Sequence, residues 1–461
     1  MNKEINKNSA LFVLCLASFL VPFMGSAINL SLPQISKTFA LGAVSQSWIA
    51  TSYLIATAIL QVPFARLADM FGRRRFFVAG LLLFCISNFL CGFASSGALL
   101  IAFRAISGVG CAMIFGTNMA ILVSLFPQNK RGKAIGINTA VVYFALASGP
   151  FFGGLMTQHF GWQSLFYLVG FLSFIAVIYS YYALKTEWIE AKGEHFDLTG
   201  SIIYAVGLFC LIFGFSELPD FWGFILIAFG IFGITGFVFY ELKQRQPLFD
   251  VRIFSGNKVF SLSSLSALIN YACTFAVGFM MSLYLQHIRG FEPQIAGFIL
   301  ISQALVQSVV SLYGGWLSDR INPSLLATLG MLLLVAGLVG LVFITTTTSL
   351  VFIIFILVLL GVGFGLFSSP NANVIMNSVD KHYYGQASAT MGTMRLTGQA
   401  FSMGIATMGL ALFVGNRQIV SELFSAFMTS FRVTFIIFAV LCALGAYTSS
   451  FRIKSLNKKQ C

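Results

Sequence analysis

The sequence predicts an all-α protein that crosses a membrane many times. Hydrophobic residues make up 58% of the 461-residue chain and charged residues only 9%, against about a quarter charged in a typical soluble domain. The apolar residues form continuous runs of about 20 residues, the length that spans a bilayer as a helix. Barrel strands would alternate apolar and polar residues instead. Because lipid admits only helices and closed barrels, these observations indicate a polytopic helical membrane protein.

Fourteen apolar runs qualify as spanning helices. The first follows a basic start with Lys3 and Lys7, as in a signal peptide, but it is long and many more runs follow. We therefore interpret it as the first spanning helix. The predicted spans are 11–30, 46–65, 76–95, 98–125, 134–158, 164–184, 198–217, 221–241, 262–286, 294–317, 325–345, 349–370, 386–414 and 430–450.

The segments between the runs divide the spans into groups. The loop after the second run, "FARLADMFGRRR", concentrates charge between two apolar stretches. A longer polar stretch, "TEWIEAKGEHFDLTG", precedes the seventh run and is predicted to be a cytoplasmic linker, in which Asp197 or Thr199 would cap the next helix. Runs seven and eight follow, and then a second group of six runs begins.

The basic residues predict the orientation of the chain. With the N-terminus inside, most Lys and Arg fall on the cytoplasmic side, as the positive-inside rule requires. Both tails are basic, so the number of spans is even, which fourteen and twelve satisfy alike. The net charge of +13 then reflects a basic cytoplasmic face of a bacterial or archaeal cell membrane rather than nucleic-acid binding. The exceptions are Lys37, Arg289, Arg417 and Arg432 on the outer side or its margin, and Arg104 and Arg395 within spans.

Two pairs of short segments indicate an internal repeat. "GGWLSDRIN" echoes "ARLADMFGR" with Asp319 lying 250 residues after Asp69, and "YGQASATMGT" echoes "RGKAIGINTA" with Gly385 lying 253 residues after Gly132. Chance likeness between short apolar segments is the alternative. Duplication predicts six-helix bundles at 1–185 and 258–452, with a linker and an inserted helix pair at 186–257 and a basic tail at 453–461. Parallel repeats of this kind occur in transporters, whose binding site lies between the halves near the midplane.

Several motifs resemble those of a known family. "ARLADMFGRRR" resembles the loop signature of the major facilitator superfamily, with Ala65 in place of its first glycine, and "LIAFRAISGVGCA" resembles the helix 4 signature with its arginine, here Arg104. "ALASGPFFGG" resembles the antiporter signature of helix 5. "ATMGTMRLTGQ", which contains Arg395, resembles a segment of the fourteen-helix drug:proton antiporters. The resemblance implies the major facilitator fold with two extra helices and both termini in the cytoplasm.

The charged loop is expected to act as a conformational latch. Glycine permits the tight turn between antiparallel helices, and the arginines can pair with the acid or with lipid phosphate. The resemblance implies that the loop binds the facing half when the cytoplasmic side is shut. A loop that only orients the chain is the alternative, which explains the arginines but neither the acid nor the glycine. The latch residues are Asp69, Gly72, Arg73, Arg74, Arg75 and Asp319.

The helix 5 segment is expected to bend and to pack closely. Gly149 and Pro150 weaken the backbone hydrogen bonds, and Gly153 and Gly154 allow a neighbouring helix to approach. The resemblance implies an exporter. Ordinary enrichment of Gly and Pro in membrane helices is the alternative.

Charges within spans are functional hypotheses because they are costly there. The resemblance gives Arg104 a role in proton coupling, whereas snorkelling or pairing with backbone carbonyls is the alternative. Arg395 is about 10 residues into its span, roughly 15 Å deep, and is the predicted cavity cation, or else a structural arginine between helices. All 14 acids lie in loops or at span margins, and Met24 stands where many relatives carry Asp. We hypothesise that such a cavity prefers neutral or anionic molecules.

Uncharged polar residues within spans are candidates to line the cavity. Hydrogen bonds between helices are the alternative role for each of them. The eight cysteines lie mostly in apolar runs without a CxxC pair and are predicted to be free thiols, and no metal site is expected. The candidates are Asn29, Tyr53, Gln61, Asn118, Tyr143, Asn270, Tyr271, Gln303, Gln307, Asn371 and Gln399.

The sequence thus predicts a secondary active transporter that exports small amphipathic compounds. The resemblance implies proton antiport with rocking of the two halves, a proton gradient as the energy source and no cofactor. Alternatives are a dedicated exporter or flippase of one endogenous product, such as a siderophore, lipid or anionic metabolite, and uptake, which the helix 5 segment disfavours. Without a nucleophile–base set, metal cluster or P-loop, an enzyme or ATP-driven pump is not expected. The predicted partners are a small-molecule substrate and the bilayer, with no nucleic acid, and the chain is expected to work as a monomer.

Overall fold

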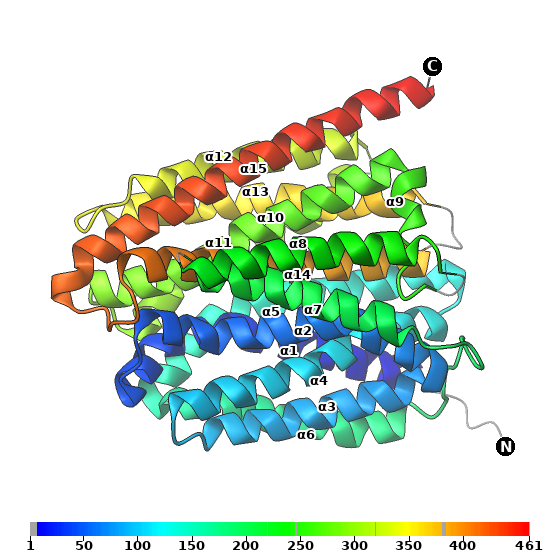
Figure 1. The fold of residues 1–461 in the computed structure, drawn as a ribbon, viewed down its shortest axis with the longest axis horizontal. Helices are drawn as coiled ribbons and strands as arrows, with labels where there is room; N and C mark the ends of the chain where they lie inside the picture. The colour runs from blue at the N-terminus through cyan, green and yellow to red at the C-terminus, as the bar shows by residue number, and fades with distance from the viewer. Residues whose placement is uncertain (1–6, 219, 245–246, 319, 380–383, 461) are drawn as a thin grey trace.

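The computed structural model describes residues 7–460 except 219, 245–246, 319 and 380–383. Its long helices lie roughly along one common axis (Figure 1). Fourteen of these helices are long and apolar enough to span a membrane, which confirms the predicted number. α1 begins and α15 ends at the same end of the bundle, here named the termini end; the opposite end is the far end (Figure 1). The helices are α1 (Lys7–Phe39), α2 (Ala43–Phe71), α3 (Arg73–Gly92), α4 (Gly97–Leu125), α5 (Gln128–Phe160), α6 (Trp162–Ala183), α7 (Leu198–Ser216), α8 (Phe221–Glu241), α9 (Arg252–Gly256), α10 (Lys258–Leu283, followed by the π turn Tyr284–Ile288), α11 (Pro293–Ser318), α12 (Pro323–Val342), α13 (Leu350–Asn377), α14 (Tyr384–Phe413) and α15 (Phe424–Gln460, preceded by the 3₁₀ turn Ser421–Leu423).

Many helices extend beyond the apolar runs that predicted them. The run at 11–30 becomes α1, which continues to Phe39, and the run at 349–370 becomes α13, which continues to Asn377. Hydropathy measures the part of a helix in hydrocarbon, whereas backbone hydrogen bonding continues until a cap or a turn ends it. α2, for example, ends at Gly72, whose φ of 121° lies in the region that favours glycine. Predicted spans therefore locate helix centres better than helix ends.

The spanning helices form two groups of six. α1–α6 pack mainly against one another, and α10–α15 do the same on the other side of the molecule (Figure 1). The groups meet where α5 packs against α11 and where α2 packs against α14. This arrangement places the interface between the groups along the centre of the bundle.

The inserted helices α7 and α8 form a hairpin that lies against this interface (Figure 1). α7 contacts α2 through Trp48, whose ring centroid lies 5.3 Å from that of Phe213, and α14 through Phe401, whose centroid lies 5.9 Å from that of Phe215. Gly207 and Gly233 let the two helices of the hairpin approach each other closely. The hairpin therefore touches both groups of six.

The described cysteines are free thiols, as the sequence predicts. All seven are buried except for the half-buried Cys15. Cys461 lies outside the described residues.

Close helix packing in the second group depends on a glycine pair, and this generates a stability prediction. A methyl group on Gly330 of α12 would lie 2.6 Å from both the Gly363 oxygen and the Phe367 nitrogen of α13, whereas one on Gly236 of α8 would meet nothing within 4 Å. We expect Gly330→Ala to destabilise the protein by about 1–3 kcal/mol, the usual cost of overpacking. Gly236→Ala should be neutral or slightly stabilising. Thermal unfolding in detergent measures both, and equal midpoints would contradict the packing argument.

Candidate functional site

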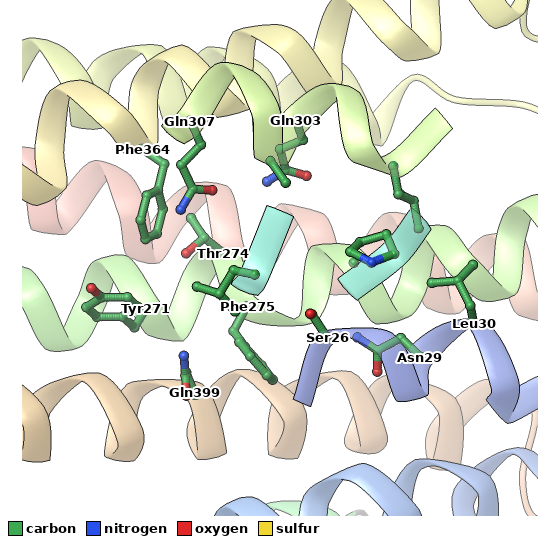
Figure 2. Close-up of a pocket in the computed structure, with 15 residues that line it drawn as sticks. Ser26, Asn29, Leu30, Tyr271, Thr274, Phe275, Gln303, Gln307, Phe364 and Gln399 are labelled. Carbon is green, nitrogen blue, oxygen red and sulfur yellow. The ribbon is translucent and has the colours of Figure 1, made fainter. Parts of the chain in front are cut away.

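A cavity lined by apolar and polar side chains lies between the two groups of six helices (Figure 2). It is small, with a volume of about 120 Å³, whereas pockets for drug-sized ligands are about 300–1,000 Å³. A larger ligand therefore requires the halves to move apart. The lining residues are Ser26, Asn29 and Leu30 of α1, Leu146 and Pro150 of α5, Tyr271, Thr274, Phe275 and Gly278 of α10, Leu300, Gln303, Ala304 and Gln307 of α11, Phe364 of α13 and Gln399 of α14.

Carboxamides dominate the polar chemistry of this cavity. Gln303 and Gln307 lie one turn apart on α11 and point into it, toward Thr274 and Phe275 of α10 (Figure 2). Each carboxamide carries both donors and an acceptor. The described lining holds no Asp, Glu, Lys, Arg or His. The wall thus offers hydrogen bonds and aromatic faces but no formal charge.

The predicted lining residues divide into two sets. Asn29, Tyr271, Gln303, Gln307 and Gln399 reach the cavity. The structure places the others elsewhere, and several make the alternative interhelical hydrogen bonds. Asn118 of α4 donates to the Leu14 oxygen at 3.3 Å, Asn371 of α13 donates to the Ser263 oxygen at 3.2 Å, and Tyr53 of α2 donates to the Val21 oxygen at 3.5 Å. Tyr143 lies beside Tyr271, Gln61 lies beside Gly392, and Asn270 is fully buried outside the lining.

Sequence reasoning missed several lining residues. Thr274 and Gly278 follow Tyr271 at helical spacing, a signal that would have found them. Phe275 and Phe364 are two of 51 phenylalanines, and nothing in the sequence distinguishes them from the phenylalanines that face lipid.

Arg104 is fully buried in the half of α4 nearer the far end. Its Nε donates to the Ile49 oxygen at 3.0 Å, and its guanidinium lies 4.2 Å from the centroid of the Tyr53 ring. Its Nη1 and Nη2 have no hydrogen-bond partner among the described residues. The side chain thus faces α2 rather than the cavity, in a site that holds a charge without a counter-ion in the described part of the chain.

Arg395 bridges the two halves. It lies on α14, and its guanidinium is 5.0 Å from the centroid of the Phe115 ring of α4. It does not line the cavity, but it precedes the lining residue Gln399 by one turn. The cation therefore lies at the edge of the cavity rather than in its wall.

The segment 64–75, predicted as a charged loop, is helical except at Gly72, because α2 continues to Phe71 and α3 begins at Arg73. This segment, for which the name charged loop is kept, binds the linker at 184–197. The Nε of Arg73 donates to Oδ1 of Asp69 at 2.6 Å, and its Nη1 donates to Oε1 of Glu190 at 2.8 Å. Arg66 pairs with Glu194 at 2.5 Å. The predicted second latch acid, Asp319, lies outside the described residues.

Backbone contacts fix the linker on the loop as well. The Arg74 nitrogen donates to Glu187 at 2.8 Å, and the Arg73 nitrogen donates to the Trp188 oxygen at 3.0 Å. A Cβ on Gly72 would lie 2.6 Å from the Glu187 carboxylate. Arg75 is mostly exposed, with its Nε 3.6 Å from Glu187. We name residues 187–194 the clasp, because they hold the loop through both side chains and backbone.

The helix 5 segment packs between the two halves. A Cβ on Gly149 would meet the Ser26 hydroxyl at 1.8 Å, one on Gly153 would meet the Ala27 oxygen at 2.5 Å, and one on Gly154 would meet the Pro293 oxygen at 2.4 Å. α5 remains one helix through Pro150. The glycines thus let α5 touch α1 on one side and α11 on the other.

Hydrogen bonds join the two halves at the far end. Gln158 of α5 donates to Glu292 at 2.6 Å, and the Ser45 hydroxyl of α2 donates to the Asn416 side chain at 3.0 Å. Deeper in the bundle, the Ser282 hydroxyl of α10 donates to the Asn29 oxygen of α1 at 2.7 Å. The far end is therefore held together in this conformation.

Two groups of six spanning helices with a cavity at their interface are an arrangement typical of secondary membrane transporters. The sequence model of the Major Facilitator Superfamily matches residues 14–403. The chain belongs to this superfamily, and it is a transporter rather than an enzyme.

Curated relatives cover most of the chain. It is 26% identical over 451 residues to the riboflavin transporter RibZ of Clostridioides difficile, which covers 97% of this chain and 98% of the relative. It is 29% identical over 408 residues to the multidrug resistance protein Stp of Mycobacterium tuberculosis (86% and 74%) and 30% identical over 417 residues to the cephamycin export protein CmcT of Amycolatopsis lactamdurans (88% and 85%).

A solved structure shares the fold. A bacterial homolog of the human lysosomal transporter Spinster, in an inward-facing and unoccupied conformation, covers 98% of both chains with a TM-score of 0.68 and 18% sequence identity.

Removing one ion pair should loosen the clasp. An exposed ion pair contributes about 0.2–1 kcal/mol, and Glu190 is 62% exposed. Glu190→Gln should therefore raise the rate of tryptic cleavage at Lys192 by between about 1.4-fold and 5-fold, since cleavage follows the population of the released linker. Glu422→Gln, near the far end, is the control. An unchanged cleavage rate in Glu190→Gln would show that the backbone contacts alone hold the clasp.

Adding a methyl group to α5 should open the far end. Gly154→Ala pushes against the Pro293 backbone, whereas Gly136→Ala on the same helix meets nothing within 4 Å. Gly278 lines the cavity and has room for a side chain, so Gly278→Cys serves as the reporter in both backgrounds. A membrane-impermeant maleimide applied from the far-end side should label it several times faster with Gly154→Ala than with Gly136→Ala. Equal labelling rates would mean that α5 does not control this end.

Proposed function

We propose that the chain exports small amphipathic compounds by proton antiport, using a rocking motion of its two halves. The observation that carries this proposal is the cavity between the halves, whose wall combines carboxamides with aromatic rings (Figure 2). The similarity to multidrug resistance and antibiotic export proteins supports export. The glycines of α5 support it further, because they lie where the antiporter signature of the family lies.

The contacts suggest how alternating access would proceed. The hydrogen bonds at the far end would break when the cavity opens there, and the charged loop would exchange the clasp for the facing half when the termini end closes. The basic residues predict that the termini end is cytoplasmic. In that orientation the far-end contacts shut the cavity off from the outside, as expected of a transporter that is ready to load a substrate from the cytoplasm.

The uncharged wall supports a substrate without positive charge. A dication in a cavity without a carboxylate would lose its hydration without gaining a counter-ion. Arg395, at the edge of the cavity, would repel it further. Arg104 would act indirectly, by holding Tyr53 and α2 in place. We therefore propose neutral or anionic amphipathic substrates.

A dedicated carrier of one flat, neutral compound is the second candidate. The riboflavin transporter RibZ aligns with nearly the whole of both chains. Riboflavin is an uncharged heteroaromatic ring with a polyhydroxyl chain, which carboxamides and phenylalanine rings would suit. Fluorescence of riboflavin taken up or lost by cells expressing the protein distinguishes this candidate from a broad exporter, because only the dedicated carrier would move riboflavin and little else.

Purified protein in liposomes with an imposed pH gradient and a pH-sensitive dye tests the proposal. Addition of a neutral or anionic amphipathic substrate should dissipate the gradient faster than in protein-free liposomes, and a dication should not. Transport without proton movement would reject antiport. Robust transport of dications would reject the assignment of substrate charge.

Loss of one carboxamide should weaken substrate binding selectively. Gln307→Leu removes a hydrogen bond of about 1 kcal/mol from the cavity wall, which would raise KM about fivefold for a polar substrate. The exposed Gln418, near the far end, provides the control Gln418→Leu. Equal KM values in the two variants would show that Gln307 does not contact the substrate.

A further inference from the structure

Two carboxyl groups meet at the termini end of the α7–α8 hairpin, outside the central cavity. Asp197 is the N-cap of α7, and Glu241 is the last residue of α8. Glu241 is only 1% exposed. Burial of an ionised carboxylate is costly unless a partner compensates it, so the surroundings of this pair require an explanation.

Each carboxyl group uses one oxygen for ordinary hydrogen bonds. Oδ1 of Asp197 accepts from the Gly200 nitrogen at 2.7 Å and from the Tyr240 hydroxyl at 3.3 Å. Oε2 of Glu241 accepts from the Phe249 nitrogen at 3.4 Å. The other two oxygens, Oδ2 of Asp197 and Oε1 of Glu241, are buried and have no donor among the described residues.

These two unpartnered oxygens both lie close to Gly200. A Cβ built on Gly200 would lie 2.4 Å from Oδ2 of Asp197 and 2.6 Å from Oε1 of Glu241. The two oxygens are therefore at most 5.0 Å apart, and the side chains are within hydrogen-bonding reach of each other. Gly200, which has no side chain, leaves the space between them open.

Other acids take the arginines at this end of the molecule. Arg66 pairs with Glu194, Arg73 with Asp69 and Glu190, and Arg75 with Glu187. Arg252 directs its Nη2 to the backbone oxygens of Leu242 and Gln244 at 3.0 and 2.9 Å. Tyr240 is the other titratable side chain on the pair, and it donates to the oxygen that is already bonded.

We propose that Asp197 and Glu241 form a proton-binding site in which one proton is shared between Oδ2 and Oε1. Two carboxylates this close cannot both ionise without strong repulsion. A single proton removes one charge and supplies the missing donor to both oxygens. The hairpin contacts α2 and α14, and Asp197 ends the linker that contains the clasp. The protonation state of the site can therefore influence the packing of the hairpin and the position of the clasp. The proposal does not depend on export, since proton binding is measurable without a substrate.

Infrared spectroscopy of the full-length protein in lipid nanodiscs tests the site. At about pH 6, where ordinary carboxyl groups are ionised, the wild type should show a C=O stretching band of a protonated carboxyl group. ¹³C-labelled glutamate should shift this band in the unmutated protein, which requires no variant to fold. The isosteric substitutions Glu241→Gln and Asp197→Asn should each abolish it. The matched control is Glu217→Gln, at the other end of the same hairpin.

The outcomes are distinct. A band that is lost with Glu241→Gln and Asp197→Asn but kept with Glu217→Gln supports the shared proton. A wild type without the band, or a band that both substitutions leave intact, overturns it. The absence of the band together with Ca²⁺-dependent stabilisation of the wild type, but not of Glu241→Gln, would assign the pair to a metal cation and would also overturn the proposal.

Discussion

The contact of α5 with α1 and α11 is the interaction on which the arrangement of the two halves depends. Side chains of ordinary size keep helix axes about 8–10 Å apart, and every methyl group added at this contact would collide with the backbone or hydroxyl of a neighbour. Glycines at Gly149, Gly153 and Gly154 let backbone meet backbone. Because α5 belongs to the first group and α11 to the second, the same contact forms the wall of the cavity and joins the halves at the far end.

At the termini end, charged side chains form ion pairs that join the charged loop to the linker. The charged loop carries the arginines, the clasp carries the acids, and Asp197 closes the linker against Glu241. In water each ion pair would contribute little, but together with the backbone hydrogen bonds of Asp69 and Trp188 they define one position for the linker. Contacts that are individually weak would suit the exchange of partners that the proposed latch requires.

The central cavity, by contrast, has no charged side chain in its described lining. Its described wall has carboxamides and rings but no Asp, Glu, Lys, Arg or His. The buried Arg104 faces Tyr53 and the half-buried Arg395 faces Phe115, rather than the open space. Carboxamides bind through hydrogen bonds whose net free energy is small, which suits a carrier that must release what it binds. The described charged contacts between segments and the uncharged cavity wall thus lie in different parts of the molecule.

The sequence alone determined the class of fold, because the cost of exposing backbone to lipid makes long apolar runs helical. The orientation that the positive-inside rule gives stays a prediction. The sequence also drew attention to Arg104 and the charged loop, since charge is rare within apolar runs, and to the glycines of α5, since they stand at the spacing of a motif; their roles stay predictions. Only the tertiary structure showed that Asn118 and Asn371 bond neighbouring helices while Gln303 and Gln307 face the cavity. Polar residues of the same type are indistinguishable until packing decides which faces meet. The meeting of Asp197 and Glu241 is likewise tertiary, because 44 residues and two helices separate them in the chain and only the antiparallel hairpin brings their carboxyl groups together.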